Sequence, residues 1–212
     1  MVADILLQVA LILLMVYFFL AMHGIPNKLL SKLRFRNRAD VQAKRHFVLG
    51  AQLLARARAS KPPRSTATSL AKEAEAEADK AIALDPKDAA PHILKSLALD
   101  LQGFKPSALD SLDVALSPLC AKSLSDLERG DSLFKRAELK VAMARRDQVD
   151  SAVTDLTQAL TLSPENAKAF CLLGECYEAK KMIDEAKKAY EDALRVEPKL
   201  TVAREALDRL GS

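Results

Sequence analysis

An alanine recurs at a nearly constant interval through this 212-residue chain, and this repeat constrains the fold more than any other feature. The intervals are 34, 44 and 34 residues, and a proline follows five residues after three of the alanines. A unit of about 34 residues has room for two helices of three to four turns and two short turns. Because one such hairpin cannot bury its apolar face alone, we expect successive hairpins to stack. The alanines are Ala81, Ala115, Ala159 and Ala193, and the prolines are Pro86, Pro164 and Pro198.

The last repeat, residues 167–198, contains two amphipathic runs with small residues at regular points. Gly174 lies in the first run, and Ala186 and Ala193 lie in the second. Small side chains at facing positions allow two antiparallel helices to approach closely. Larger side chains fill the space around this contact, and Pro198 ends the second helix.

This arrangement resembles the tetratricopeptide repeat (TPR), a family of helical hairpins. The resemblance implies an all-α, TPR-like helical-hairpin solenoid over residues 43–198, with about four hairpins, and a capping helix over residues 199–212. The pattern is weaker before residue 167, where Lys140 replaces the usual small residue and Arg136 replaces the usual aromatic residue. The eight positions of the TPR pattern fall on Phe170, Leu173, Gly174, Tyr177, Ala186, Tyr190, Ala193 and Pro198.

Two sequence features predict where helices begin and end in the earlier hairpins. Ser125 and Glu128 match the S-x-x-E capping box, which predicts a long first helix running from there towards Arg146. In the first hairpin, the insertion KPPRSTATS separates a helix expected around residues 43–59 from one expected around residues 70–84.

The N-terminal segment has a different character. Residues 5–22 contain one strongly polar side chain, Gln8. As a helix they rise about 27 Å, close to the roughly 30 Å of a hydrocarbon core. We therefore expect a short tail at residues 1–4 and one transmembrane signal-anchor helix at residues 5–23. One alternative is a cleaved signal peptide, but the basic start that it needs is absent. The other is a buried core helix, but the segment has no polar face.

Charge is divided unevenly along the chain. Residues 1–64 hold eleven Lys or Arg against two Asp, a net charge of +9, and the rest holds 21 basic and 26 acidic residues, a net charge of −5. The basic juxtamembrane segment at residues 24–42 follows the apolar run, so the positive-inside rule predicts a single-pass membrane protein with a cytosolic C-terminal domain. The endoplasmic reticulum and the outer membranes of mitochondria and plastids all remain open. We expect membrane lipid to contact residues 5–38. The alternative is that the basic residues of this segment only set the topology of the chain.

Motifs for catalysis, cofactors or metals are lacking. Cys171 and Cys176 are five residues apart on one expected helix and face different directions, which favours core positions over metal ligation. The three histidines are scattered, and no Gly-rich phosphate loop is present. We therefore expect no enzymatic activity, no cofactor, no metal, no nucleic acid and no small-molecule substrate.

The TPR resemblance also implies a binding groove, because the first helix of each hairpin lines the concave surface in this family. Transferred to this sequence, the groove is apolar near the N-terminal end and charged at the far end. It suits a protein partner that supplies an amphipathic helix or an extended peptide. The alternative is that these side chains belong to the core. The predicted groove residues are Phe47, Leu54, Ile93, Leu97, Leu101, Phe134, Val141, Arg145, Lys168 and Glu175.

Two functions fit this organisation. The first is a membrane-anchored, cytosol-facing TPR adaptor that binds another protein through its groove. The alternative is a structural or assembly subunit of a larger membrane protein complex.

Overall fold

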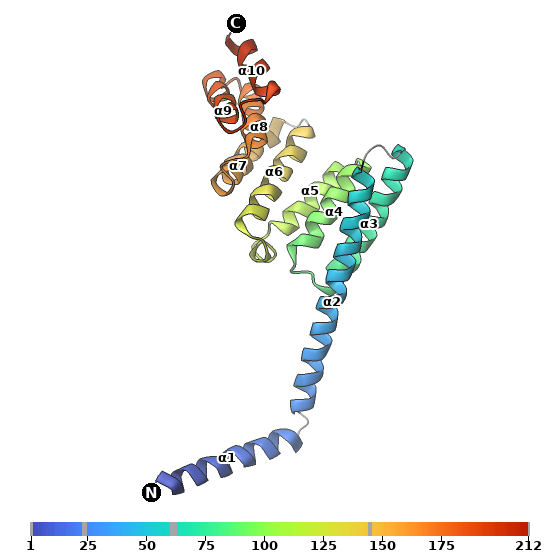
Figure 1. Ribbon diagram of the computed structural model, residues 1–212, viewed down its shortest axis with the longest axis vertical. Coiled ribbons are helices and arrows are strands. Elements are labelled where there is room, and N and C mark those ends of the chain that lie inside the picture. The colour runs from blue at the N-terminus through green and yellow to red at the C-terminus, as the bar shows by residue number, and fades with distance from the viewer. Residues whose placement is uncertain (1, 23–24, 60–62, 144–145, 212) are drawn as a thin grey trace.

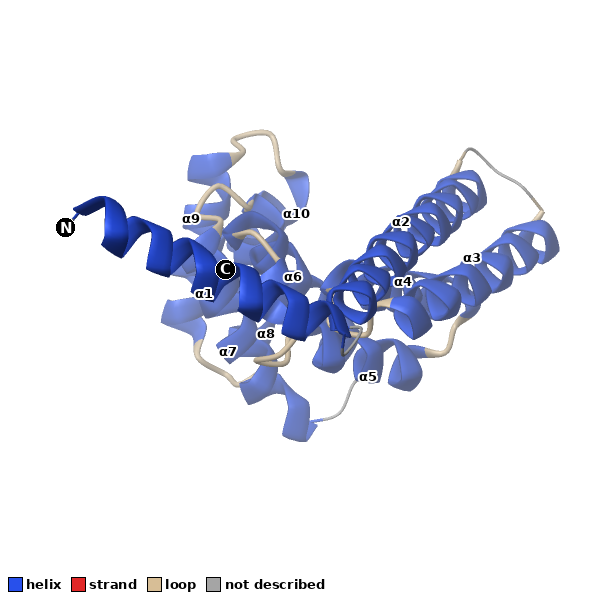
Figure 2. Cartoon of the chain, turned by 90° about the horizontal axis from the view of Figure 1, so that it is seen from below, coloured by secondary structure: helices blue, strands red, loops and turns tan. Residues whose placement is uncertain are grey.

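The computed structural model of the chain describes residues 2–22, 25–59, 63–143 and 146–211. Within these ranges every regular element is a helix (Figures 1 and 2). This confirms the predicted all-α, TPR-like solenoid. A single helix, α1 (Val2–Met22), precedes the hairpins, and η1 (Ala121–Ser123) lies between the second and third of them. The hairpins are α2 (Ile25–Arg58) with α3 (Arg64–Leu84), α4 (Ala89–Gln102) with α5 (Lys105–Ala115), α6 (Asp126–Ala142) with α7 (Arg146–Leu162), and α8 (Ala167–Ala179) with α9 (Ile183–Val196); α10 (Thr201–Gly211) ends the chain.

Side chains fix where several helices begin and end. The Asp88 carboxylate accepts a hydrogen bond from the Ala90 amide at the start of α4, and the Asn166 side chain does the same for Ala169 at the start of α8. Ser125 and Glu128 form both hydrogen bonds of the predicted capping box. Helix α6 therefore begins as predicted, but it ends at Ala142, short of the expected Arg146.

The first hairpin differs from the expectation at both of its helices. Helix α2 is continuous from Ile25 to Arg58, so it unites the basic segment at 24–42 with the first helix of the repeat. Helix α3 begins at Arg64, about six residues earlier than expected. Pro63 occupies its N-cap, and a proline fits there because the first turn of a helix needs no amide donor at that point.

The core is a series of small clusters, and three of them join one hairpin to the next. Leu112 and Leu139 pack between the second and third hairpins, and Leu156 packs with Leu173 between the third and fourth. Burying one such leucine contributes about 1.5–3 kcal/mol. At the C-terminal end, Ala203 of α10 packs onto the fourth hairpin and covers its outer side.

Helix α1 extends away from the hairpins together with the first part of α2 (Figure 1). Its described side chains, at residues 5–16, 18 and 19, are all exposed, and most of them are large and apolar. In the part of the chain that the structure describes, no helix is both long enough and apolar enough to cross a membrane. The transmembrane helix expected at residues 5–23 is therefore not confirmed.

Candidate protein-binding surface

The first helices of the hairpins, α2, α4, α6 and α8, are neighbours in space. Helix α2 packs against α4, and α6 packs against α8. Between these pairs, the Lys135 ammonium of α6 lies 2.8 Å from the Asp100 carboxylate of α4. These contacts bring the predicted groove residues onto one row of helices.

The predicted groove residues differ in how far solvent reaches them. Leu54 is 4% exposed and lies in the core cluster between α2, α3 and α4, so its side chain is closed to a ligand. Leu101 is 36% exposed, and Lys168 and Glu175 are exposed on α8. Arg145 lies outside the described residues. The other five are half-buried against core clusters, and they are Phe47, Ile93, Leu97, Phe134 and Val141.

Solvent therefore reaches the predicted apolar groove residues only in part. Each half-buried side chain has one edge in solvent and the other edge in the core. The alternative that these residues belong to the core is therefore correct for the second edge. Among the predicted apolar residues, Leu101 offers the most exposed surface. A role for these residues in binding stays a prediction.

The charged end of the row is an ordered network. The Tyr190 hydroxyl donates to Glu178 Oε1 at 2.6 Å, and Arg209 Nη2 of α10 donates to both Glu178 oxygens, at 2.8 and 3.0 Å. Desolvation of the Glu175 carboxyl and the charge of Glu178 raise the pKa of Glu175. A cationic ligand group near Glu175 would relieve this repulsion, so the network suits a basic group on the partner.

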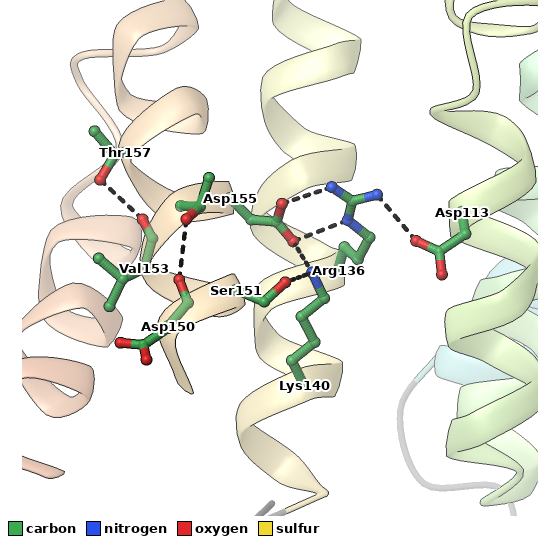
Figure 3. A network of polar contacts seen from close by, with 9 residues as sticks. Asp113, Arg136, Lys140, Asp150, Ser151, Val153, Asp155 and Thr157 are labelled. Carbon is green, nitrogen blue, oxygen red and sulfur yellow. Dashed lines mark hydrogen bonds and ion pairs between the residues drawn. The ribbon is translucent and has the colours of Figure 1, made fainter. Parts of the chain in front are cut away.

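Two different contacts hold the helices that carry this surface. In the fourth hairpin, Gly174 faces the ring of Tyr190, and a Cβ atom at Gly174 would lie 2.7 Å from two of the ring carbons. This confirms that Gly174 lies at a helix contact. In the third hairpin, the Asp155 carboxylate accepts hydrogen bonds from Arg136 Nε at 2.8 Å and from Lys140 Nζ at 2.6 Å (Figure 3).

The Arg136 network also reaches the neighbouring hairpin. Arg136 Nη1 lies 2.9 Å from Asp113 of α5, while Lys140 Nζ also donates to Ser151 Oγ at 2.6 Å. The sequence pattern treated Arg136 and Lys140 only as departures from the TPR consensus. Their four-residue spacing on one helix, opposite an aspartate in the next helix, is the signal that indicates such a network.

The two cysteines of α8, Cys171 and Cys176, are buried. Burial raises the pKa of the Cys171 and Cys176 thiols to about 11, so both are protonated at neutral pH. Among the described side chains, no three His, Cys, Asp or Glu residues come together as metal ligands. That the protein has no enzymatic activity stays an expectation.

The fold and the row of first helices define a class: the described chain is a TPR-like helical solenoid. Residues 143–210 match the model of the tetratricopeptide repeat family. This match covers the second helix of the third hairpin, the fourth hairpin and α10, and it includes the repeat in which the sequence pattern is strongest.

Solved structures of other proteins share the fold over most of the chain. MamA from Desulfovibrio magneticus RS-1 is 17% identical, with 80% of this chain and 84% of that chain covered and a TM-score of 0.64. For pilF of Pseudomonas aeruginosa, the identity is 20%, the coverage 81% and 68%, and the TM-score 0.62. YrrB, a TPR protein with an unusual peptide-binding site, is 19% identical, with 70% and 74% covered and a TM-score of 0.56.

Proposed function

We propose that this chain is an adaptor that binds another protein along its first helices, α2, α4, α6 and α8. The supporting observation is the change of character along this row, from half-buried apolar side chains on α2 and α4 to exposed charges on α8. Such a surface suits an amphipathic helix or an extended peptide with apolar anchors at one end and a basic group at the other. The peptide-binding site of YrrB is consistent with this use of the fold.

Exposed residues provide the cleanest test of this adaptor. Leu101→Asp and Glu175→Lys change the row at positions where solvent already reaches the side chain, so we expect the melting temperature to stay within about 2 °C of wild type. Photo-crosslinking from the row in cells, followed by mass spectrometry, should show that both variants lose the crosslinked partner. Lys188→Asp, on the exposed side of α9, is the control and should retain it. Unchanged crosslinking in both row variants would exclude this surface.

The half-buried residues test whether the row is also structural. Leu97→Asp and Val141→Asp place a charge at the edge of a core cluster. Loss of partner with a folded domain assigns these side chains to binding. Unfolding, measured by circular dichroism, assigns them to the core and restricts the binding surface to the exposed positions.

We further propose that residues 5–38 attach the adaptor to membrane lipid, with the repeats on the cytosolic side. The exposed apolar side chains around α1 and the cations that follow it support lipid as the covering environment. Protease added to sealed membranes should remove a C-terminal tag, and carbonate extraction should leave the protein in the membrane pellet. A protected tag contradicts the orientation, and full release by carbonate contradicts insertion into the lipid.

A stably bound subunit of a larger membrane complex is the second candidate. The exposed apolar surface of α1 favours it as well, because neighbouring helices of a complex are able to cover that surface in place of lipid. Co-purification at fixed stoichiometry through roughly 1 M salt, which screens surface charge pairs, supports the subunit, whereas exchangeable capture supports the adaptor.

A further inference from the structure

The first hairpin exposes a helix face that the later hairpins bury. In three of the hairpins, a leucine directly precedes the residue at the helix contact: Leu49 before Gly50, Leu139 before Lys140, and Leu173 before Gly174. Leu139 is 1% exposed and Leu173 is 8% exposed, because each packs against the preceding hairpin. Leu49 is 46% exposed. The same repeat position is thus uncovered at one end of the stack.

The surroundings of Leu49 form a continuous outer face of α2. Helical spacing places Val41, Arg45, Val48, Leu49, Gln52 and Arg56 on one side of this helix. All six are exposed, and an open hollow of about 820 Å³ lies over the first five of them. At the other end of the stack α10 covers the fourth hairpin. The described chain supplies no equivalent helix for the outer face of α2.

The contacts between the later hairpins show which side chains cover such a face. The second helix of one hairpin contributes small and aliphatic residues to it, as Ala152 and Leu156 of α7 do against Leu173 of α8. It also contributes a carboxylate that pairs with a cation on the next first helix or, for Lys180, at its C-cap. The three pairs are Asp79 with Lys95 at 2.7 Å, Asp113 with Arg136 at 2.9 Å, and Asp150 with Lys180 at 2.5 Å.

The repeat position of Lys180, one of these three cations, holds a cation on α2 as well. Lys180, which pairs with Asp150, lies six residues after Gly174, and Arg56 lies six residues after Gly50. Among the described side chains, neither Arg45 nor Arg56 has a carboxylate within ion-pair distance. The outer face of α2 therefore combines exposed aliphatic side chains with unpaired positive charge.

We propose that the outer face of α2 binds an amphipathic, acidic helix of a partner protein, which packs as the second helix of a preceding hairpin would. Its Ala and Leu residues cover Val48 and Leu49, and its carboxylate pairs with Arg56. This face of α2 contains neither of the predicted groove residues of that helix, Phe47 and Leu54. Binding there goes beyond the adaptor function, because it extends the stack at its N-terminal end. The two cations of this face, Arg45 and Arg56, favour an acidic helix over a second copy of the same basic face.

A peptide of residues 146–162, the sequence of α7, is the probe for this site. It contains Asp150, Ala152 and Leu156, which cover the equivalent face of α8. A hydrocarbon staple between positions 154 and 158, both exposed on α7, keeps the peptide helical. Fluorescence anisotropy measures its binding to the full chain in detergent micelles. We expect Leu49→Asp to weaken binding about tenfold or more, through loss of apolar contact.

A charge exchange makes the assignment specific. Arg56→Glu should weaken the peptide about threefold, and a peptide with Asp150→Lys should recover that loss against the Arg56→Glu chain. Lys188→Glu, on exposed α9, should leave the affinity unchanged. Equal affinity for wild-type and Leu49→Asp chains, or no binding at all, overturns the proposal. If the chain is instead a dimer that Leu49→Asp dissociates in sedimentation experiments, the occupant is a second copy, and the proposal is wrong.

Discussion

The third and fourth hairpins occupy consecutive places in the repeat, yet they close by different chemistry. Residues 34 apart in sequence take the same place: Lys140 corresponds to Gly174, and Leu156 corresponds to Tyr190. In the fourth hairpin a glycine admits a tyrosine ring. In the third hairpin Lys140 takes the place of the glycine, and its ammonium group pairs with the Asp155 carboxylate.

The difference shows that the contact between the two helices of a hairpin must be filled and its polar groups paired. No single residue type is essential there.

A polar contact between the two helices is also present in the first hairpin. His46 Nδ1 lies 2.6 Å from Glu77 in the first hairpin, and these two residues hold the repeat positions of Arg136 and Asp155. A polar contact costs more when one partner is lost, because it leaves a charge without compensation in the interior. The two hairpins should therefore respond differently to mutation.

The largest effect is expected at Asp155. Asp155→Ala leaves the Lys140 ammonium, and part of the Arg136 guanidinium, without a counter-charge in the interior. We expect a loss of about 3–5 kcal/mol in the free energy of unfolding, measured by urea denaturation. The double variant Lys140→Met with Asp155→Ala should recover a large part of that loss. If the double variant is as unstable as Asp155→Ala, the uncompensated charge is not the cause.

Gly174→Leu tests the apolar contact in the fourth hairpin. The Cβ atom alone would meet the Tyr190 ring at 2.7 Å, so the larger side chain forces the helices apart. We expect a loss of more than about 2 kcal/mol, within the range of about 1–3 kcal/mol or more for overpacking. Lys188→Leu, on the exposed side of α9, is the control and should cost less than about 0.5 kcal/mol. Equal losses in thermal unfolding would place Gly174 away from the contact.

Tyr190→Phe separates the ring from its hydroxyl group. The ring stays in place against Gly174, but the hydrogen bond to Glu178 at 2.6 Å is lost. We expect a loss of about 1 kcal/mol in urea denaturation, because Glu178 keeps its contact with Arg209. A loss as large as that of Gly174→Leu would mean that the hydroxyl network, and not the ring, closes this hairpin.

The smallest effect is expected at Glu175, and its sign is opposite. The pKa of Glu175 is raised in the folded state, so folding disfavours the charged carboxylate and stability falls as the pH rises through the ordinary Glu range. Glu175→Gln should therefore stabilise the protein at neutral pH by less than about 0.5 kcal/mol, since solvent screens this exposed side chain. The gain should vanish near about pH 3, where both states hold the proton. A gain that persists in acid would indicate a packing effect.

The sequence predicted the elements that depend on local signals. The capping residue Ser125 and the small residue Gly174 each act through neighbours in the same hairpin, so spacing alone locates them. The hairpin count followed from the 34-residue period for the same reason. These features need no knowledge of how one hairpin sits on the next.

Contacts between hairpins were less accessible to prediction. Leu54 occupies a groove position in the repeat, but α4 covers it through the Leu94 cluster, and only the packing of three helices reveals this. The pairing of Arg136 with Asp113 depends on the joint between α5 and α6, whose connecting segment breaks the period by ten residues. Partner identity depends on residues of another molecule, which no pattern in this chain contains.

The continuity of α2 has a mechanical consequence. A helix of 34 residues is a rod about 51 Å long, and its first 18 residues, 25–42, place the repeats about 27 Å from its N-terminal end. Such a rod fixes direction as well as distance, because each residue turns the helix by about 100°. Inserting one alanine within residues 25–42 would rotate every hairpin about the helix axis by that angle. Inserting four would bring the hairpins close to their original orientation and would mainly move them further along the axis.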